Sequence, residues 1–236
     1  GTNSMRDKPF PGTRAKSAAM VRGLFVKAQE YQKKLAAAKT APEKAPERDL
    51  KMEGLIEILE GKRMVHFHTH RHDHVSEAWK VADEIADAKV PVSLIFIDSP
   101  GGKMEAVDLL PKSGMALEKA GVDVAFHTDD PITDSRLFLR SAAIAVRAGM
   151  TKTKALEGLT LAGARMLELD NRIGSLEKGK DADFIILSGD PLSVYSHVEQ
   201  TWIEGIKVFD RADSEDKAYA VGGYHVYPEA TTHVHD

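Results

Sequence analysis

The sequence predicts an α/β protein built around a parallel sheet. Two short apolar runs, residues 92–97 and 122–126, each follow a stretch of helical periodicity and each lead into polar residues. A short continuous apolar run is typical of a strand that is buried on both faces of a parallel sheet. Because strands alternate with helices, we expect repeated β-α units whose functional residues gather at the carboxyl ends of the strands.

Composition limits the classes of function. With 236 residues, of which 42% are hydrophobic, the chain can form one large or two modest domains. The 32 basic and 36 acidic residues are spread along the chain, so the net charge of -4 predicts no basic face for nucleic acid or membranes. Cysteine is absent, which excludes disulfides, thiolate metal sites and a cysteine nucleophile. The sequence contains no apolar run long enough for a membrane span and no signal-peptide pattern, but its opening residues 1–5 are compatible with the middle of a longer chain, in which a targeting segment would lie upstream. These features favour a small-molecule or peptide substrate.

Two helices are expected at the start of the chain. Residues 15–38 carry apolar side chains at helical spacing on an Ala- and Lys-rich background, which predicts an exposed amphipathic helix. Residues 40–47 contain two prolines and no periodicity, so they predict a loop. A second helix is expected at residues 49–60, ending at Gly61.

A histidine cluster comes next and is the best functional signal. Five of the ten histidines lie within residues 66–74. If this segment is a strand, alternate residues share a face, and imidazoles two residues apart stand about 7 Å apart at Cβ, near enough to share one divalent ion. The alternative is a solvated strand face whose histidines titrate freely. The row consists of His66, His68, His70 and His72.

Helices and strands alternate through the next part of the chain, and short β runs follow them. Helices are expected at residues 76–88, 104–119, 142–147 and 154–167, and strands at 92–97 and 122–129, with a Gly-rich loop at 98–102. From Gly174 onward, two short β runs at residues 184–187 and 201–209 are joined by turns, which predicts a small β element.

At this point the chain resembles the metal-dependent amidohydrolase superfamily, in particular its imidazolonepropionase-like branch. Residues 174–187 are similar to that family's Gly-x-Leu-x-x-Gly-x-x-Ala-Asp motif, and residues 124–129 resemble its last barrel strand with a metal-binding aspartate. The resemblance implies the later half of a (β/α)8 barrel of the TIM type with a small β-sandwich. We therefore expect barrel structure in residues 1–173, the β-sandwich element in 174–211 and a tail in 212–236.

The resemblance also implies a site. His68 and His74 match the histidines of the fifth and sixth barrel strands, so they become metal ligands together with Asp129. Asp129 would also be catalytic, because it would accept a proton from the attacking water. The implied cofactor is a divalent metal, first of all zinc, as one or two ions, and the implied reaction is hydrolysis of a C–N bond in an amide, cyclic amide or dipeptide-like substrate.

Other polar residues have weaker assignments. His70, Arg71 and Ser99 are substrate-binding candidates, although His70 would equally well support a ligand or simply line the barrel. His127 shares a face with Asp129, so it either orients that residue or fills a layer of the barrel. We interpret Asp130 and Asp134 as caps or loop acids rather than metal ligands, and residues 233–235 as a solvated tail.

Two departures from the family pattern leave alternatives open. No counterpart is found for the family's first-strand His-x-His pair or for the fourth-strand residue that bridges two metals, which predicts a missing N-terminal half. Parallel strands need a crossover of about a dozen residues, yet the predicted strand ending near His72 runs directly into His74. We therefore expect that about twenty residues are absent between Asp73 and His74. The alternatives are a non-catalytic metal-binding or scaffolding relative and an unrelated histidine-rich protein. A homo-oligomer is compatible with the sequence.

Overall fold

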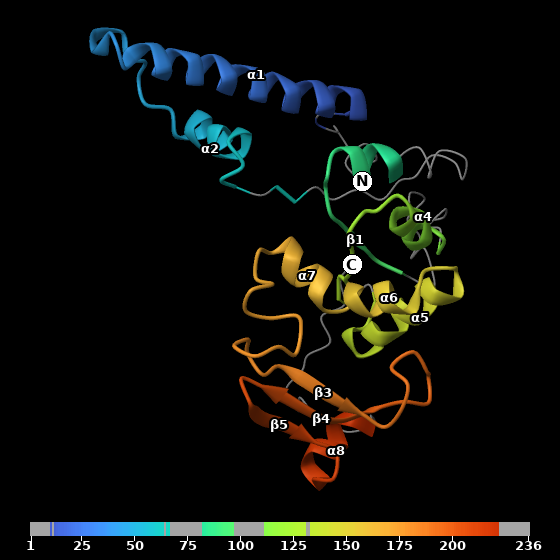
Figure 1. Cartoon of the computed structure of the whole chain (residues 1–236). Coiled ribbons are helices and arrows are strands. Elements are labelled where there is room, and N and C mark those ends of the chain that lie inside the picture. The colour runs from blue at the N-terminus through green and yellow to red at the C-terminus, as the bar shows by residue number, and fades with distance from the viewer. Residues whose placement is uncertain are drawn as a thin grey trace. The chain divides into compact units, whose positions relative to one another are not determined.

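The computed structural model describes residues 10, 12–63, 65–66, 82–96, 111–130 and 133–221. The chain divides into two compact units, Gly1–His70 and Arg71–Asp236 (Figure 1). The expected domain boundaries at residues 173 and 211 stay predictions.

The first unit contains a helical hairpin. Helices α1 (Arg14–Ala38) and α2 (Leu50–Leu59) match the helices predicted from periodicity, and a 3-10 turn, η2 (Pro42–Lys44), lies in the proline-containing loop between them. Asp49 caps α2 by accepting from the N–H groups of Lys51 and Met52. The Tyr31 hydroxyl donates to the Glu47 carbonyl oxygen and accepts from the Asp49 N–H, so it holds the loop against α1. The small core of the hairpin consists of Ala28, Tyr31, Met52 and Ile56.

A parallel β-α-β unit forms the centre of the second unit. Strands β1 (Val92–Leu94) and β2 (Val124–Phe126) pair in parallel, and helix α4 (Ser113–Lys119) lies between them in sequence. Ser93 is registered with Ala125, and Leu94 with Phe126. Since neighbouring residues of a strand face opposite sides, the first pair lies on one face of the sheet and the second pair on the other. The predicted parallel pairing is confirmed.

Three further helices follow β2: α5 (Phe138–Arg147), α6 (Lys152–Gly158) and α7 (Leu161–Met166). Phe96 and Phe126 contact each other at 5.5 Å between ring centroids and form one core with apolar residues of α4, α5 and α6. A Cβ atom on Gly158 would lie 2.7 Å from the Phe126 ring, so only glycine lets α6 approach β2 this closely. The single helix predicted at residues 154–167 was wrong, because the chain breaks at Thr160, whose φ is -139° and ψ -92°.

A separate antiparallel sheet contains β3 (Phe184–Leu187), β4 (Val198–Ile203) and β5 (Ile206–Asp210), in that order. The predicted pairing of the two β runs is confirmed, but the second run is a hairpin rather than one strand. Glu204 and Gly205 both have positive φ, as a two-residue hairpin turn requires. Helix α8 (Ser214–Val221) follows in the segment that we expected to be a plain tail. Among the described residues this sheet has no second sheet facing it, so the sandwich stays a prediction.

The glycine motif that begins at Gly174 joins these two parts of the second unit. Gly174 has φ +91°, and a Cβ atom there would lie 2.7 Å from the Ala164 side chain of α7. Gly179 also has positive φ but has open space around it. At the end of the motif, the Asp183 carboxylate accepts from the Glu204 N–H and so supports the β4–β5 turn. Gly174, Gly179 and Asp183 of the motif therefore each have a local structural role.

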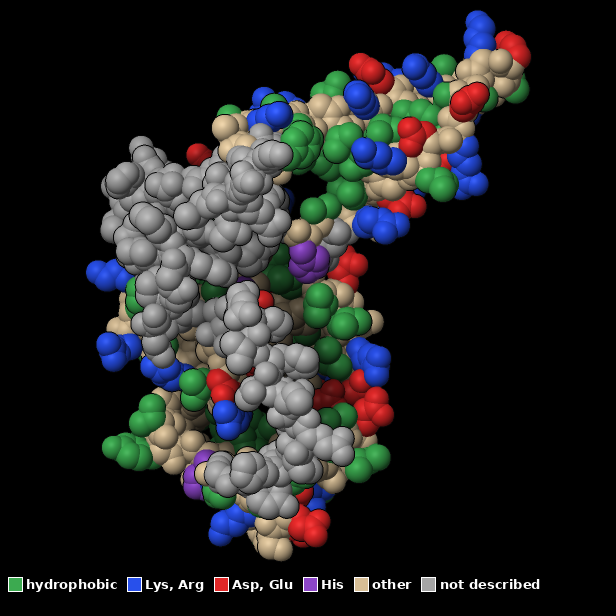
Figure 2. Space-filling model, turned by 180° about the vertical axis from the view of Figure 1, so that it is seen from behind, with side chains coloured by type: hydrophobic (Ala, Val, Ile, Leu, Met, Phe, Trp, Pro, Cys, Tyr) green, Lys and Arg blue, Asp and Glu red, His purple; other side chains and the backbone are tan. Residues whose placement is uncertain are grey.

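The surface agrees with the composition. On the face shown in Figure 2, basic and acidic side chains are interspersed over the described residues. No helix in the described part of the chain is both long and apolar enough to cross a membrane.

The histidine segment is described only at its start. Val65 and His66 are exposed and lie outside any strand, so the predicted strand is absent at these two residues. A strand requires a hydrogen-bonded neighbour, and within the described ranges neither residue pairs with one. Residues 67–81, including the predicted discontinuity between Asp73 and His74, lie outside the described residues. Barrel closure stays a prediction.

Two glycines of the motif allow the cost of a positive φ to be separated from the cost of overlap between a Cβ atom and α7. Gly179→Ala should lower the free energy of unfolding by about 1–2 kcal/mol, the cost of a left-handed backbone for a residue with a Cβ atom. Gly174→Ala should cost about 1–3 kcal/mol more, because its Cβ atom also overlaps α7. Urea unfolding of both variants checks this. Equal losses would show that the close approach of Gly174 to α7 contributes nothing.

Candidate functional site

The candidate site lies at the carboxyl ends of β1 and β2, where the predicted catalytic residue Asp129 follows β2 after two residues. Asp129 has φ +49°, a left-handed conformation that aspartate tolerates better than most residues. The His127 N–H donates to the Leu94 carbonyl oxygen, so regular attachment to β1 extends one residue beyond β2. The chain therefore leaves the sheet just before Asp129.

The loop that carries Asp129 is closed by hydrogen bonds. The Thr133 N–H donates to the Thr128 carbonyl oxygen at 3.0 Å, and the Thr133 hydroxyl donates to the Phe96 carbonyl oxygen at 3.3 Å. Asp130 accepts from the N–H of Ser135 at 3.0 Å and also from its hydroxyl. These contacts tie the loop both to itself and to Phe96, which lies two residues beyond β1.

The three acids of this region differ in their partners. Asp130 is held by Ser135, and Asp134 caps the following 3-10 turn η4 (Ser135–Leu137) by accepting from the Arg136 N–H. The Arg136 guanidinium also donates to Asp134 and lowers the pKa of that carboxyl to about 2. These observations confirm the predicted cap and loop roles. Within the described residues, Asp129 alone of the three has neither a hydrogen bond nor an ion pair through its carboxylate.

A polar pair precedes this loop on the face of the sheet opposite Leu94 and Phe126. The Ser93 hydroxyl and His127 Nδ1 are 2.7 Å apart, and both residues are partly buried. Sequence reasoning considered His127 but missed Ser93. The available signal was a single serine inside the apolar run of residues 92–97, at a position that shares a face with the polar end of the next strand.

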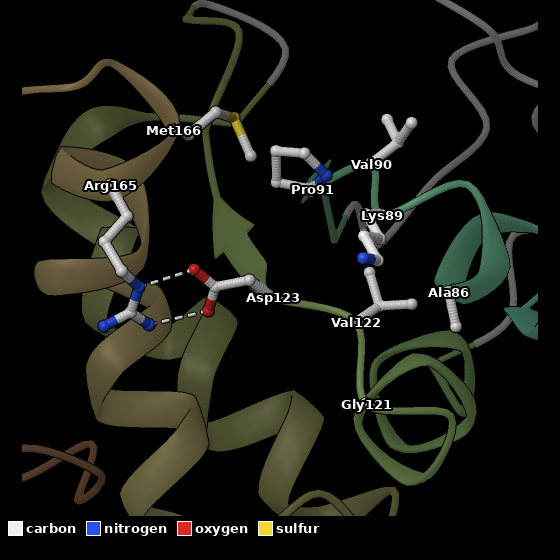
Figure 3. A pocket seen from close by; sticks show the side chains of 9 residues that line it. All are labelled: Ala86, Lys89, Val90, Pro91, Gly121, Val122, Asp123, Arg165 and Met166. Atoms are coloured by element: carbon white, nitrogen blue, oxygen red, sulfur yellow. Dashed lines mark hydrogen bonds and ion pairs between the residues drawn. The ribbon is translucent and has the colours of Figure 1, made fainter.

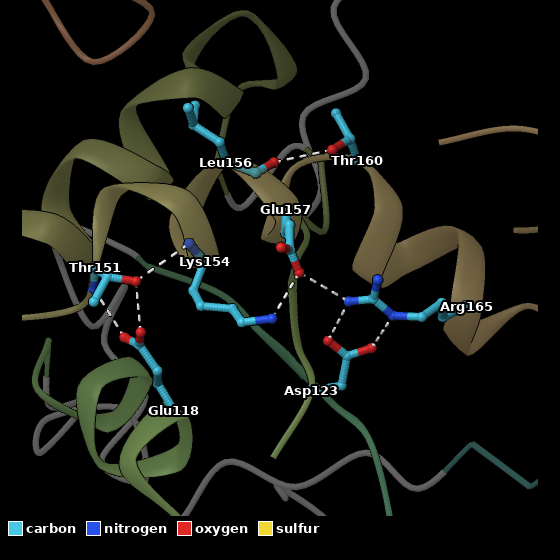
Figure 4. Close-up of polar contacts among 8 residues, drawn as sticks. All are labelled: Glu118, Asp123, Thr151, Lys154, Leu156, Glu157, Thr160 and Arg165. Atoms are coloured by element: carbon cyan, nitrogen blue, oxygen red, sulfur yellow. Dashed lines mark hydrogen bonds and ion pairs between the residues drawn. The ribbon is translucent and has the colours of Figure 1, made fainter. Parts of the chain in front are cut away.

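The other end of the same strands is built differently. Arg165 of α7 donates two hydrogen bonds of 2.6 Å to the Asp123 carboxylate, immediately before β2, and a third to Glu157 of α6 (Figure 4). Glu157 also accepts from Lys154 at 2.8 Å. Hydrogen bonding from Arg165 lowers the pKa of Asp123, and hydrogen bonding first from Lys154 and then from Arg165 lowers the pKa of Glu157. This network fixes α6 and α7 to the start of β2.

A pocket of about 340 Å³ opens at that end, beside the residues that precede both strands (Figure 3). Its walls are largely apolar, and its ionic groups include Asp123 and Arg165, which are already paired with each other. Because β1 and β2 are parallel, both strands begin beside this pocket, whereas Asp129 lies beyond their carboxyl ends. The pocket is therefore separate from the candidate site.

The predicted ligand set is only partly described. Asp129 lies in the described part, whereas the other predicted metal and substrate residues, His68, His70, Arg71, His74 and Ser99, lie outside it. Within the ranges that the structure does describe, no three His, Asp or Glu side chains are grouped closely enough to hold an ion. The convergence of His68 and His74 on Asp129 stays a prediction.

Comparison with known proteins shows which family the chain matches. The amidohydrolase family matches residues 29–209, which include the end of α1, all of α2, the parallel strands and the three-stranded sheet up to Phe209. This chain belongs to the amidohydrolase family. The predicted family is thus confirmed, and membership implies a barrel of the TIM type as the coarse fold.

Individual relatives in the amidohydrolase family cover the chain to different extents. A solved amidohydrolase from Thermotoga maritima is 34% identical, with a TM-score of 0.72 over 85% of this chain and 57% of its own. Amidohydrolase tasK from Hapsidospora irregularis is 32% identical over 51% of this chain and 12% of its own. An imidazolonepropionase from Desulfotalea psychrophila is 36% identical over 32% of this chain and 19% of its own. The chain thus spans well under two thirds of these relatives.

The ionic network predicts a pH-dependent contribution to stability. Asp123→Asn should lower the free energy of unfolding at pH 7 by about 1–2 kcal/mol, a modest value because water screens partly exposed charges. Since the pKa of folded Asp123 lies below its ordinary value of about 3.9, its stabilisation is complete above that pH and is lost as the pH falls through the folded pKa. Denaturant unfolding from pH 7 to 2.5 measures the difference.

Asp134→Asn is the matched control for this measurement. Asp134 also pairs with an arginine, but the pair is exposed and asparagine can still cap the 3-10 turn. Because water screens the exposed Asp134–Arg136 pair, Asp134→Asn should lower the free energy of unfolding at pH 7 by less than Asp123→Asn does. The pKa of Asp134 is also lowered, so this smaller difference should likewise shrink as the pH falls. A gap between wild type and Asp123→Asn that stays constant down to pH 2.5 would contradict the electrostatic interpretation.

Proposed function

We propose that the protein is a metal-dependent hydrolase that cleaves a C–N bond in an amide, a cyclic amide or a dipeptide-like substrate. The observation that carries this proposal is the Asp129 carboxylate, which is exposed at the carboxyl end of β2 and unpaired within the described residues. Membership of the amidohydrolase family and the names of relatives, amidohydrolase and imidazolonepropionase, support the same chemistry. The substrate itself depends on loops that vary freely on barrels.

The predicted donor set fits a divalent metal. His68 and His74 would contribute imidazole nitrogens and Asp129 a carboxylate oxygen, the kinds of ligand found in catalytic zinc sites without sulfur. When bound, the ion would polarise the substrate carbonyl and a water molecule. We further propose that the remaining ligands come from another part of a longer protein, since this chain spans 57% of the Thermotoga chain.

The residues of this chain would then handle the proton and the substrate. Asp129 accepts a proton from the attacking water while the water oxygen bonds to the carbonyl carbon. The C–N bond breaks with its electron pair going to nitrogen, and Asp129 passes the proton to that nitrogen, which leaves as an amine. His70, Arg71 and Ser99 are the proposed substrate contacts, at positions that vary with specificity in such barrels.

Substitution of Asp129 tests the mechanism in the full-length protein. Asp129→Asn should retain much of the bound zinc, because an amide oxygen can still coordinate, but should lower turnover roughly 10²–10⁴-fold by removing the proton acceptor. His68→Ala should instead lose zinc and activity together. Zinc analysis and hydrolysis of a panel of dipeptides, N-acetyl amino acids and cyclic amides provide the measurements.

Asp130→Asn provides the neighbouring control. Asp130 holds Ser135 by accepting a hydrogen bond, which an asparagine oxygen also does, so this variant should turn over at nearly the wild-type rate. If Asp129→Asn hydrolyses its substrate as fast as Asp130→Asn, the proposed role of Asp129 is excluded.

A further inference from the structure

His127 is attached to β1 at two points. Its N–H donates to the Leu94 carbonyl oxygen at 3.0 Å, and its Nδ1 lies 2.7 Å from the Ser93 hydroxyl. The first contact continues the strand ladder, whereas the second depends on two specific side chains. Because Ser93 is held in β1 by its parallel pairing with β2, it restricts the orientation of the imidazole ring as well as the backbone.

These contacts define the start of the loop that carries Asp129. Among the described residues, the next attachment of this chain segment is the hydrogen bond from the Thr133 hydroxyl to the carbonyl oxygen of Phe96, two residues beyond β1. Asp129 therefore lies between two fixed points, His127 and Thr133. Within the described residues the Asp129 carboxylate makes no hydrogen bond. The position of Asp129 is therefore set there by the backbone on either side of it.

We propose that Ser93 and His127 act as a positioning pair for Asp129, and this inference rests on the catalytic role proposed above for that residue. The pair holds the end of β2 against β1, so that the turn at Asp129 begins from one defined place. Neither residue needs to touch the substrate for this role. Loss of the Ser93 hydroxyl should leave the fold intact but should allow the Asp129 loop to shift.

The chain contains a second Ser–His pair that provides a matched control. The Ser188 hydroxyl and His197 Nδ1 are 3.2 Å apart at the edge of the three-stranded sheet, directly after β3 and directly before β4, and both residues are exposed. Ser188→Ala removes the same chemical contact without altering β1 or β2. Any effect that is specific to the positioning of Asp129 should be absent from this variant.

The experiment compares Ser93→Ala, Ser93→Thr and Ser188→Ala in the full-length protein. Ser93→Ala should lower kcat by about 10–100-fold, the usual effect of removing a group that orients a ligand, with KM and zinc content unchanged. Ser93→Thr keeps the hydroxyl and should recover most of the loss. Hydrogen exchange followed by mass spectrometry should show faster exchange in residues 127–133 of Ser93→Ala alone, as expected when a local anchor is lost.

Two outcomes would overturn the inference: unchanged exchange and kcat in Ser93→Ala, or a loss of activity that Ser93→Thr does not restore. Thermal unfolding of each variant separates these results from failure to fold. If the wild type lacks hydrolytic activity that depends on Asp129, the proposed function fails, and hydrogen exchange alone then decides whether Ser93 anchors the loop.

Discussion

The parallel pairing of β1 with β2 is the constraint on which the rest of the second unit depends. Its register puts Leu94 and Phe126 on one face and Ser93 and Ala125 on the other. The first face is covered by helices through an aromatic and aliphatic core, and the contact between Phe126 and Gly158 shows how closely α6 approaches. The second face is left with small and polar side chains, so the same pairing that builds the core also brings Ser93 and His127 together.

The carboxylates at the two ends of β2 lie in different environments. Before the strand, Asp123 is bound by Arg165 in a geometry of two short hydrogen bonds, and its pKa is lowered accordingly. After the strand, Asp129 has no such partner among the described residues and occupies a left-handed turn. A carboxylate that is committed to an arginine stabilises the fold but is poorly available for proton transfer. This contrast agrees with the general pattern in β/α barrels, in which stability is built at one end and chemistry at the other.

Sequence reasoning succeeded where local physics decides the outcome. The helices of the first unit, the parallel strands and the β3–β4 pairing follow from periodicity and apolar runs, and the family followed from the motif that begins at Gly174. It failed where tertiary contacts override periodicity. The helix break at Thr160 interrupts an otherwise helical pattern, and the hairpin turn at Glu204 uses a residue that rarely adopts positive φ. Ser93 was missed because its role depends on a contact with a residue 34 positions away.

The positions of the motif glycines explain why a short sequence identifies so large a fold. Gly174 is required by both its backbone angle and its approach to α7, whereas Gly179 is required by its backbone angle alone. Asp183 then supports the β4–β5 turn, and the Asp181 carboxylate accepts a 2.6 Å hydrogen bond from Arg172. These residues lie close together in the sequence. The segment that contains them connects α7, the third helix after β2, to the three-stranded sheet. Such a junction restricts sequence independently of substrate, so it identifies the family, while the residues that select a substrate remain free to change.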